Sequence, residues 1–339
     1  MSELQLGLLF IGVVAIVGVI VYNRLQERLA GRQAERAFGS RHADVLLGES
    51  APRREPTLEA VARKPDHEPD ASTQTLPDEA LDYVIRLTVQ RPLSVSAFLE
   101  YWVPLEHRFA KRALAAGSED GSAWRRITQG DPAAYGAVQI ALQLVSRAGV
   151  VNEGELIEFR SGVENLAAAL GATVAAPEMK RAMERARELD QFCADTDIQI
   201  VLNLVPAAGG PFSEAKLDSA IAAAGLGRGA DGAYVLHDAD GHVLYAVSPV
   251  SGAGEGELAK LGFYLDVPRV PEVRKTYESM ARLARQLASG LGGTLVDDNG
   301  RALDEQSLAA IGVELDTVRQ ALEGRGLPPG GALALRLFS

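Results

Sequence analysis

The sequence contains little of what several classes of protein require. Cys193 is the only cysteine among 339 residues, which excludes a disulfide framework and a zinc site built on cysteine, and suits a reducing compartment. Lysine and arginine number 34 against 45 acidic residues, and the formal net charge is -11. Because binding to a phosphate backbone needs clustered basic side chains, no nucleic-acid partner is predicted.

Motifs of catalysis and cofactor binding are also missing. The chain has no Walker loop, no Gly-x-Ser-x-Gly elbow and no HExxH helix. The run from Gly225 to Gly229 has the glycines of a dinucleotide-binding loop, but it follows an expected helix, whereas that loop must follow a strand and open a helix. It is interpreted as a helix stop. The sequence therefore predicts a non-enzymatic protein with no cofactor and no catalytic residues.

Two polar clusters contain side chains that metals prefer, from His237 to His242 and from Asp297 to Gly300. In both, aspartate and glycine are the residues that a tight turn requires. Because side chains alternate along a strand pair, the imidazoles of His237 and His242 are not brought together. Turns are therefore favoured, and no metal site is predicted. An enzyme would remain an alternative if a structure gathered His237, His242 and Asp297 in one pocket.

The longest apolar run extends from Leu4 to Tyr22 and carries no charge. Its length matches the roughly 20 residues that a membrane-spanning helix needs. A secretory signal peptide would have positive charges before its apolar core and a cleavage site after it. Here the arginines follow, which predicts a membrane helix over residues 1–23 with the N-terminus outside and the rest of the chain in the cytoplasm. The helix would contact lipid through Leu4–Tyr22 and through the arginines after it, which are Arg24, Arg28, Arg32, Arg36 and Arg41.

Residues 24–80 are predicted to form a basic juxtamembrane segment and a linker. From about His42 to Glu79 the sequence is polar, has mixed charges and lacks a sustained apolar period, which is typical of disorder. A flexible coil of this length has a root-mean-square reach of about 35 Å. The prediction is a tether, and whether it orders on binding stays open.

Two related α/β units are predicted to follow, over residues 81–194 and 195–339. Leu170-Gly-Ala-Thr-Val-Ala175 resembles Leu291-Gly-Gly-Thr-Leu-Val296, and each follows a stretch with helical apolar periodicity. Each unit also opens with an alternating strand, at 83–89 and at 198–205. Two unrelated α/β domains are the alternative, because Leu-Gly-Gly-Thr after a helix is common capping chemistry. The role of the first unit and the oligomeric state stay open.

The second unit is predicted to have an α+β fold. Helices are expected from Ser213, from Pro271 and from Asp304, since each opens a segment with apolar spacing of three and four residues. Strands are expected at 233–237, 242–248, 262–267, 295–296 and 332–338, the last closing the sheet. Helices on one side of a mainly antiparallel sheet leave its other face uncovered. That face is a candidate binding surface.

Motifs of the second unit resemble, in order, the FtsZ-binding domain of the bacterial division protein family ZipA. They are Asn203 after an apolar strand, Ser219–Gly225, Tyr234, Tyr264–Pro268 and Gly292–Asp298. An N-terminal span followed by a linker is also similar to the ZipA architecture. The resemblance covers the anchor and about residues 195–323, and it does not include residues 81–194.

The resemblance implies an adaptor that links the FtsZ ring to the inner membrane at the division site. The open sheet face would bind the short, partly apolar C-terminal tail of FtsZ. The predicted partner-binding residues are Val201, Asn203, Val235, Tyr245, Val247, Pro249 and Tyr264. Ordinary sheet packing is the alternative for the valines, and the two tyrosines are the favoured anchors.

Two positions depart from the family pattern. Asp231 and Pro249 stand where the family would have methionine, and losing adaptable thioethers leaves the shape of the groove and its affinity open. A membrane-anchored scaffold for another envelope or division protein is therefore the alternative function.

Overall fold

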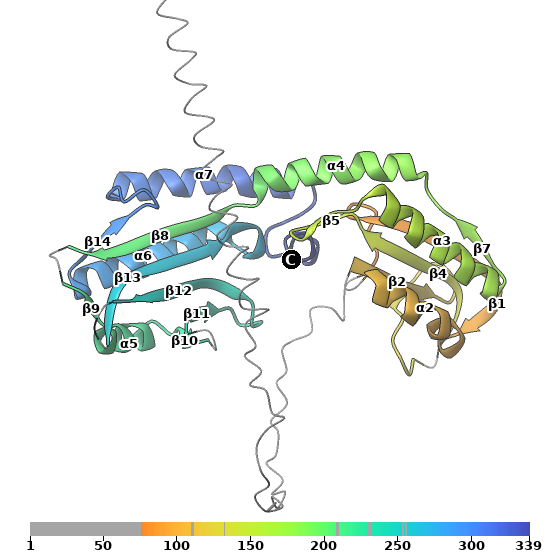
Figure 1. Cartoon of the computed structure of the whole chain (residues 1–339), viewed down its shortest axis with the longest axis horizontal. Coiled ribbons are helices and arrows are strands. Elements are labelled where there is room, and N and C mark those ends of the chain that lie inside the picture. Colours follow the sequence, from red (N-terminus) through yellow and green to blue (C-terminus); the bar gives the residue numbers. More distant parts are fainter. Residues whose placement is uncertain are drawn as a thin grey trace, which may run out of the picture. The chain divides into compact units, whose positions relative to one another are not determined.

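The computed structural model describes residues 76–339, apart from 110–111, 132, 208–209, 230–231, 253 and 255. The predicted membrane helix over residues 1–23 and the linker up to residue 75 lie outside the described residues. Within the described part, no helix combines the length and the apolar character needed to cross a bilayer. The described chain is an α+β protein whose strands pair antiparallel (Figure 1).

The first unit contains a five-stranded sheet in the order β3-β2-β4-β1-β7. Its elements are β1 (Asp82–Ser94), α2 (Val95–Phe109), β2 (Ala113–Ser118), β3 (Arg125–Arg126), β4 (Ala134–Gln143), β5 (Val145–Ser146), β6 (Gly149–Val150), α3 (Glu153–Leu170), β7 (Ala172–Ala175) and α4 (Met179–Thr196).

Aromatic side chains contribute to the core of this unit at the helix α2. Phe98 and Trp102 of α2 stack with ring centroids 5.9 Å apart, and Phe109 meets Phe159 of α3 edge to face at 5.2 Å. The helices approach closely because a Cβ at Gly162 would lie only 2.5 Å from a methyl carbon of Leu105. Large rings and one missing side chain thus pack α2 and α3 together.

The second unit contains a longer sheet in the order β10-β11-β12-β13-β8-β14, with β9 paired to β13. Its elements are β8 (Gln199–Pro206), β9 (Phe212–Ser213), α5 (Glu214–Ala223), β10 (Gly227–Arg228), β11 (Tyr234–His237), β12 (Val243–Ser251), β13 (Glu257–Asp266), η3 (Val267–Arg269), α6 (Val273–Leu291), β14 (Gly293–Val296), α7 (Glu305–Gly324) and α8 (Ala332–Leu337).

The two sheets share one connectivity. In the first sheet four neighbouring strands lie in the order β2-β4-β1-β7, and in the second sheet four lie in the order β12-β13-β8-β14. The chain passes through the corresponding positions in the same sequence in both sheets. The similar Leu-Gly motifs occupy the same place, because α3 ends at Gly171 with φ 63° and α6 ends at Gly292 with φ 72°, just before the edge strand. The common topology agrees with two related units, whereas their descent from one copy stays a prediction.

Several elements predicted from the sequence differ from those in the structure. The closing strand predicted at 332–338 is wrong, because α8 occupies these residues and buries Ala334, Leu337 and Phe338 at helical spacing. Alanine and leucine are strong helix formers, so alternation alone was misleading. The strand expected from Gly262 begins at Glu257, and the helix expected from Pro271 begins at Val273 after η3.

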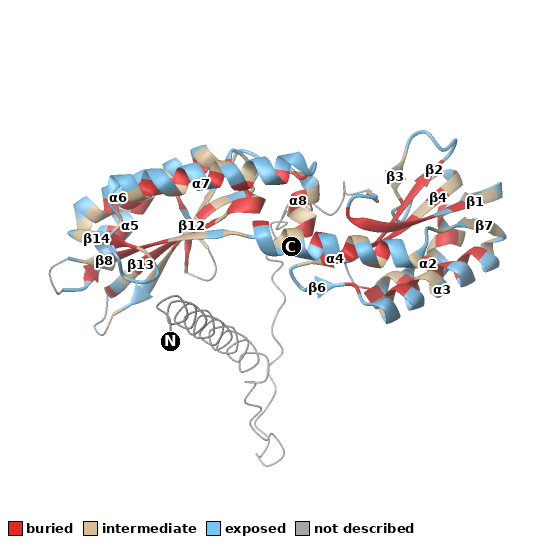
Figure 2. Cartoon of the chain, turned by 90° about the horizontal axis from the view of Figure 1, so that it is seen from above, coloured by how far each residue is buried: buried red, intermediate tan, exposed pale blue. Residues whose placement is uncertain are grey.

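Helices of the second unit pack on one face of its sheet. Leu202 and Leu204 of β8 are buried, whereas Val201 and Val205 on either side of them are only half-buried. This alternation is what a sheet with one covered face produces. Figure 2 shows the same contrast, with buried residues following the strands and exposed residues on the outer sides of the helices.

Candidate partner-binding face

The uncovered face of the second sheet is defined here by two rows of side chains that cross neighbouring strands. One row follows the register Val201–Tyr264–Ala246–Val235, from β8 to β11, and the other follows Asn203–Gly262–Ser248. We call these seven residues the open face. The alternate row, Leu202–Phe263–Val247–Tyr234, is buried under the helices.

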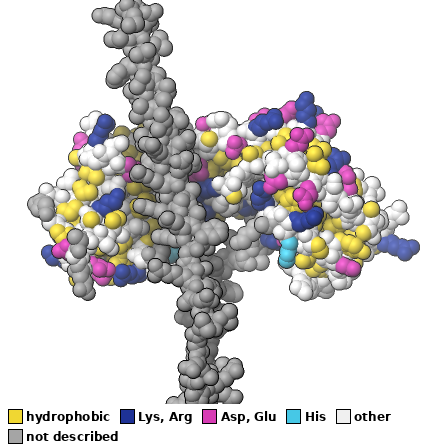
Figure 3. Space-filling view, viewed as in Figure 1, with side chains coloured by type: hydrophobic (Ala, Val, Ile, Leu, Met, Phe, Trp, Pro, Cys, Tyr) yellow, Lys and Arg dark blue, Asp and Glu magenta, His cyan; other side chains and the backbone are white. Residues whose placement is uncertain are grey.

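Apolar side chains on the open face remain partly accessible. Val201, Val235, Ala246 and Tyr264 are each half-buried. Figure 3 shows hydrophobic side chains on the surface of the second unit, with charged side chains of both signs among them. An exposed apolar sheet surface with an aromatic residue suits the apolar side of a short peptide.

Tyr264 lies flat along its own strand. A Cβ on Gly262 would come within 2.6 Å of the Tyr264 hydroxyl oxygen and 2.7 Å of its ring, so the phenol ring covers Gly262. Glycine is the residue that leaves this room. The arrangement presents a broad aromatic surface in the middle of the open face, where a partner side chain can stack.

Asn203 is a polar residue of the open face and is almost fully buried. Its amide Nδ2 donates to Oδ1 of Asp298 at 2.9 Å, in the turn that follows β14. A buried amide needs such a partner to offset its lost hydration. Asn203 therefore holds the turn against one edge of the open face.

Three of the predicted residues lie on the wrong side for this surface. Tyr245 and Val247 are buried on the helix-covered face, and Pro249 pairs with buried Leu261 on that same side. Burial raises the pKa of Tyr245, whose hydroxyl bonds Ser279 of α6. A one-residue error in register moves a whole strand's side chains to the opposite face, and the prediction for β12 contained that error.

The other four predicted residues, Val201, Asn203, Val235 and Tyr264, share the open face. Sequence reasoning missed Ala246, Ser248 and Gly262. The spacing of Gly262 two residues before Tyr264 was a usable signal, since residues i and i+2 share a face. Asp231, one of the two family departures, lies outside the described residues.

The polar clusters behave as turns. Among the described residues, the group placed closely enough to hold a metal ion is Asp238, Asp240 and His242, which excludes His237 and Asp297. Oδ1 of Asp238 accepts the backbone N–H groups of Asp240 and His242 at 2.9 and 2.8 Å. The carboxylate is thus engaged in closing the hairpin turn, and His237 and Asp297 do not join His242 in one group, which was the condition for the enzyme alternative.

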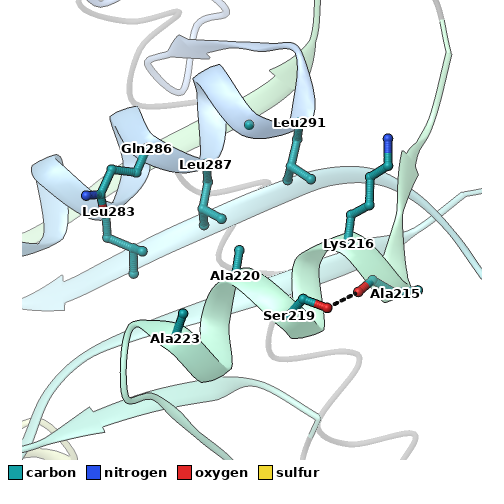
Figure 4. Close-up of a pocket in the computed structure, with 10 residues that line it drawn as sticks. Ala215, Lys216, Ser219, Ala220, Ala223, Leu283, Gln286, Leu287 and Leu291 are labelled. Atoms are coloured by element: carbon teal, nitrogen blue, oxygen red, sulfur yellow. Dashed lines mark hydrogen bonds between the residues drawn. The ribbon is translucent and has the colours of Figure 1, made fainter.

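A hollow lies on the helix side of the second unit, between α5 and α6 (Figure 4). It encloses about 520 Å³. Leu283, Leu287 and Leu291 of α6 point toward the small side chains Ala220 and Ala223 of α5. The hollow exists because α5 places small residues where a larger side chain would meet α6.

Comparison with known families decides what this sheet is similar to. Residues 198–313 match the family model of the ZipA C-terminal FtsZ-binding domain. The resemblance to the ZipA family is confirmed for this segment. The match begins just before β8 and ends in α7, so it contains the whole open face, and the first unit lies outside it. No curated protein matches the chain.

The ZipA domain is named for binding a protein and not for a reaction. This agrees with an open face whose half-buried side chains are mostly apolar: Val201, Val235, Ala246 and Tyr264, with Ser248 beside them.

Proposed function

We propose that the ZipA-like domain binds the C-terminal tail of FtsZ on its open face. The observation that carries the proposal is the coincidence of the family match with an accessible apolar sheet surface centred on Tyr264. An amphipathic tail places its apolar side chains over Val201, Val235 and Ala246, and stacks against the Tyr264 ring. The protein acts as an adaptor and not as an enzyme.

The full chain then tethers FtsZ polymers to the bacterial inner membrane during cell division. Leu4–Tyr22 forms the anchor, residues 24–80 form the juxtamembrane segment and linker, and the two folded units lie in the cytoplasm. Many tails on one polymer face many anchored domains, so contacts that are weak individually add up to firm attachment. The apolar run and the linker composition support this arrangement.

Tail binding is tested by fluorescence anisotropy with a labelled FtsZ tail peptide and the detergent-solubilised full chain. Tyr264→Ala is expected to weaken binding about tenfold or more, because it removes an aromatic anchor. Tyr245→Phe is the matched control, since this ring lies on the covered face and should leave affinity within about twofold. Equal effects of the two variants, or no binding by the parent chain, would contradict the proposal.

Localisation gives a second test. A fluorescent fusion of the full chain is expected to collect at midcell and to lose that pattern when FtsZ is depleted. Midcell localisation that persists without FtsZ would favour the alternative, a scaffold for another division protein, which a pull-down from membranes would then identify.

A further inference from the structure

Side chains of the C-terminal helix α8 reach into the first unit. The Arg336 guanidinium donates to Oδ1 of Asp82 at 2.6 Å and to Oε1 of Gln143 at 3.3 Å. In return, Nε2 of Gln143 donates to the backbone carbonyl of Arg336 at 3.0 Å. Asp82 is fully buried and the Arg336 side chain is 11% exposed. Removing one member of such a pair leaves a buried charge without a partner, so the contact strongly resists opening.

A second arginine makes the reverse connection, from the first unit to the second. Arg147, in the turn between β5 and β6, donates two hydrogen bonds to Asp266 at 2.7 Å each and further bonds to Asp197. Its guanidinium also lies over the Phe338 ring, 5.9 Å from the centroid. Paired, forked contacts of arginine with carboxylates fix orientation as well as distance.

Helix α8 is firmly held by its own unit. Phe338 is fully buried, and its carbonyl accepts from Nη1 of Arg269 at 3.0 Å. In the preceding loop, the Gly330 N–H donates to the carbonyl of Pro268 at 3.0 Å. Both partners follow directly after β13, the strand that carries Tyr264. A displacement of Arg336 therefore acts on the end of a strand of the open face.

Arg336 also contacts the point where the linker joins the folded chain. Its Nη1 donates to the carbonyl of Leu76 at 3.3 Å, and the Asp82 carboxylate accepts the Asp78 N–H at 2.8 Å. The covalent route from Leu76 to the second unit runs through all of β1 to α4. The route through Arg336 and α8 is far shorter.

We propose that Arg336, Asp82, Gln143 and Arg147 form an inter-unit latch that joins the two units into one body and connects the linker directly to the open-face strand β13. Tension between a membrane tether and a bound polymer then passes through the latch and spares the first unit from being pulled apart. Only this last statement rests on the proposed function, because the latch itself requires no partner.

The test measures the distance distribution between spin labels on the two units of the full chain. Labels at Val103→Cys in α2 and Val313→Cys in α7 use exposed positions, in a background with Cys193→Ala. The parent is expected to give one narrow distribution, which Arg336→Ala broadens at least twofold in width. Arg147→Ala should broaden the distribution as well. Because Arg147 is partly exposed, this variant still tests the latch if Arg336→Ala does not fold.

Arg319→Ala is the matched control, because its ion pairs with Asp316 and Glu323 lie within α7, and it should leave the distribution narrow. A broad distribution in the parent, or a narrow one in both latch variants, would overturn the latch. Tail-peptide affinity should stay within about twofold in the latch variants. Loss of tail binding in the parent would instead refute the proposed function and leave the latch standing.

Discussion

The two units share a connectivity and use it differently. In the first, Phe98 and Trp102 stack within α2, Phe109 of α2 meets Phe159 of α3, and Leu105 fills the space over Gly162. In the second, α5 buries only Leu217 and Ile221 and leaves a hollow beside α6. The same strand order therefore tolerates helices that pack closely through aromatic rings and helices that leave a hollow between them, because connectivity fixes which elements touch and side chains fix how closely.

The sheet faces opposite the helices differ as well. In the first unit, Val84, Ala141 and Leu114 form a row across β1, β4 and β2 and are nearly fully buried. In the second unit, the row through Val201 and Tyr264 stays partly accessible. A shared topology thus does not imply a shared binding surface, and the accessible aromatic row belongs to the unit that matches ZipA.

The largest expected effect is on the aromatic core of the first unit. Phe159→Ala should lower the free energy of unfolding by about 3–5 kcal/mol, since it removes a fully buried ring and leaves a cavity. Ile157→Ala, an exposed position on the same helix, should change it by less than about 0.5 kcal/mol. Denaturant titration of the full chain measures both. A loss below about 1 kcal/mol for Phe159→Ala would show that the ring is not essential to this core.

Substitutions at two glycines distinguish a position that matters for packing from one that matters for binding. Gly162→Val should cost about 1–3 kcal/mol of stability, because the new side chain meets Leu105 inside the core. The three atoms nearest to a Cβ at Gly262 all belong to the Tyr264 side chain. Because this side chain can swing toward solvent, Gly262→Val should change stability little while tail affinity falls. Unfolding and peptide anisotropy measured on both variants separate the effects. The reverse pattern would mean that Gly262 serves the core.

The helices α3 and α6, which hold equivalent places, begin differently. Asn152 caps α3 in a full capping box with Glu155, each side chain bonding the other's backbone N–H. Asn152→Ala should therefore cost about 1 kcal/mol. Chemical denaturation measures it, with Asn299→Ala in an exposed turn as the control. No loss would mean that water replaces the cap fully.

The smallest expected effect is a gain at α6. Glu272 precedes this helix in the left-handed region, with φ 48° and ψ 49°, and its side chain does not cap the helix. Glycine adopts this conformation without the steric cost that a Cβ imposes. Glu272→Gly should stabilise the protein by up to about 1 kcal/mol, measured as a rise in midpoint temperature. A decrease would show that its ion pair with Lys275 matters more than the backbone.

Much of the fold followed from local signals. The Asp240-Gly241 turn forms as predicted, with Gly241 at φ 85°, and Gly225 ends α5 at φ 78°. The α7 residues Leu308, Leu315, Val318 and Leu322 are buried at helical spacing. Each of these features depends on residues within a few positions of one another, which is why the sequence was sufficient.

The residues that the sequence misplaced depend on long-range pairing. Which face Tyr245 and Val247 occupy is set by the register of β12 against β13, and by the irregularity in its pairing with β11. Alternation predicts that neighbouring residues of a strand face opposite ways, but not which of them faces the helices. Four of the seven predicted residues share the open face because the prediction assigned the correct face to their strands, β8, β11 and β13.

The sequence by itself determined the apolar and polar periods, the turns and the helix ends, because these arise from backbone preferences and nearest neighbours. Only the tertiary structure decided that Arg336 reaches Asp82 across 254 positions of the chain, and that Tyr264 covers Gly262 on an accessible face. Those outcomes depend on which distant surfaces exclude water together, and no local pattern encodes that choice.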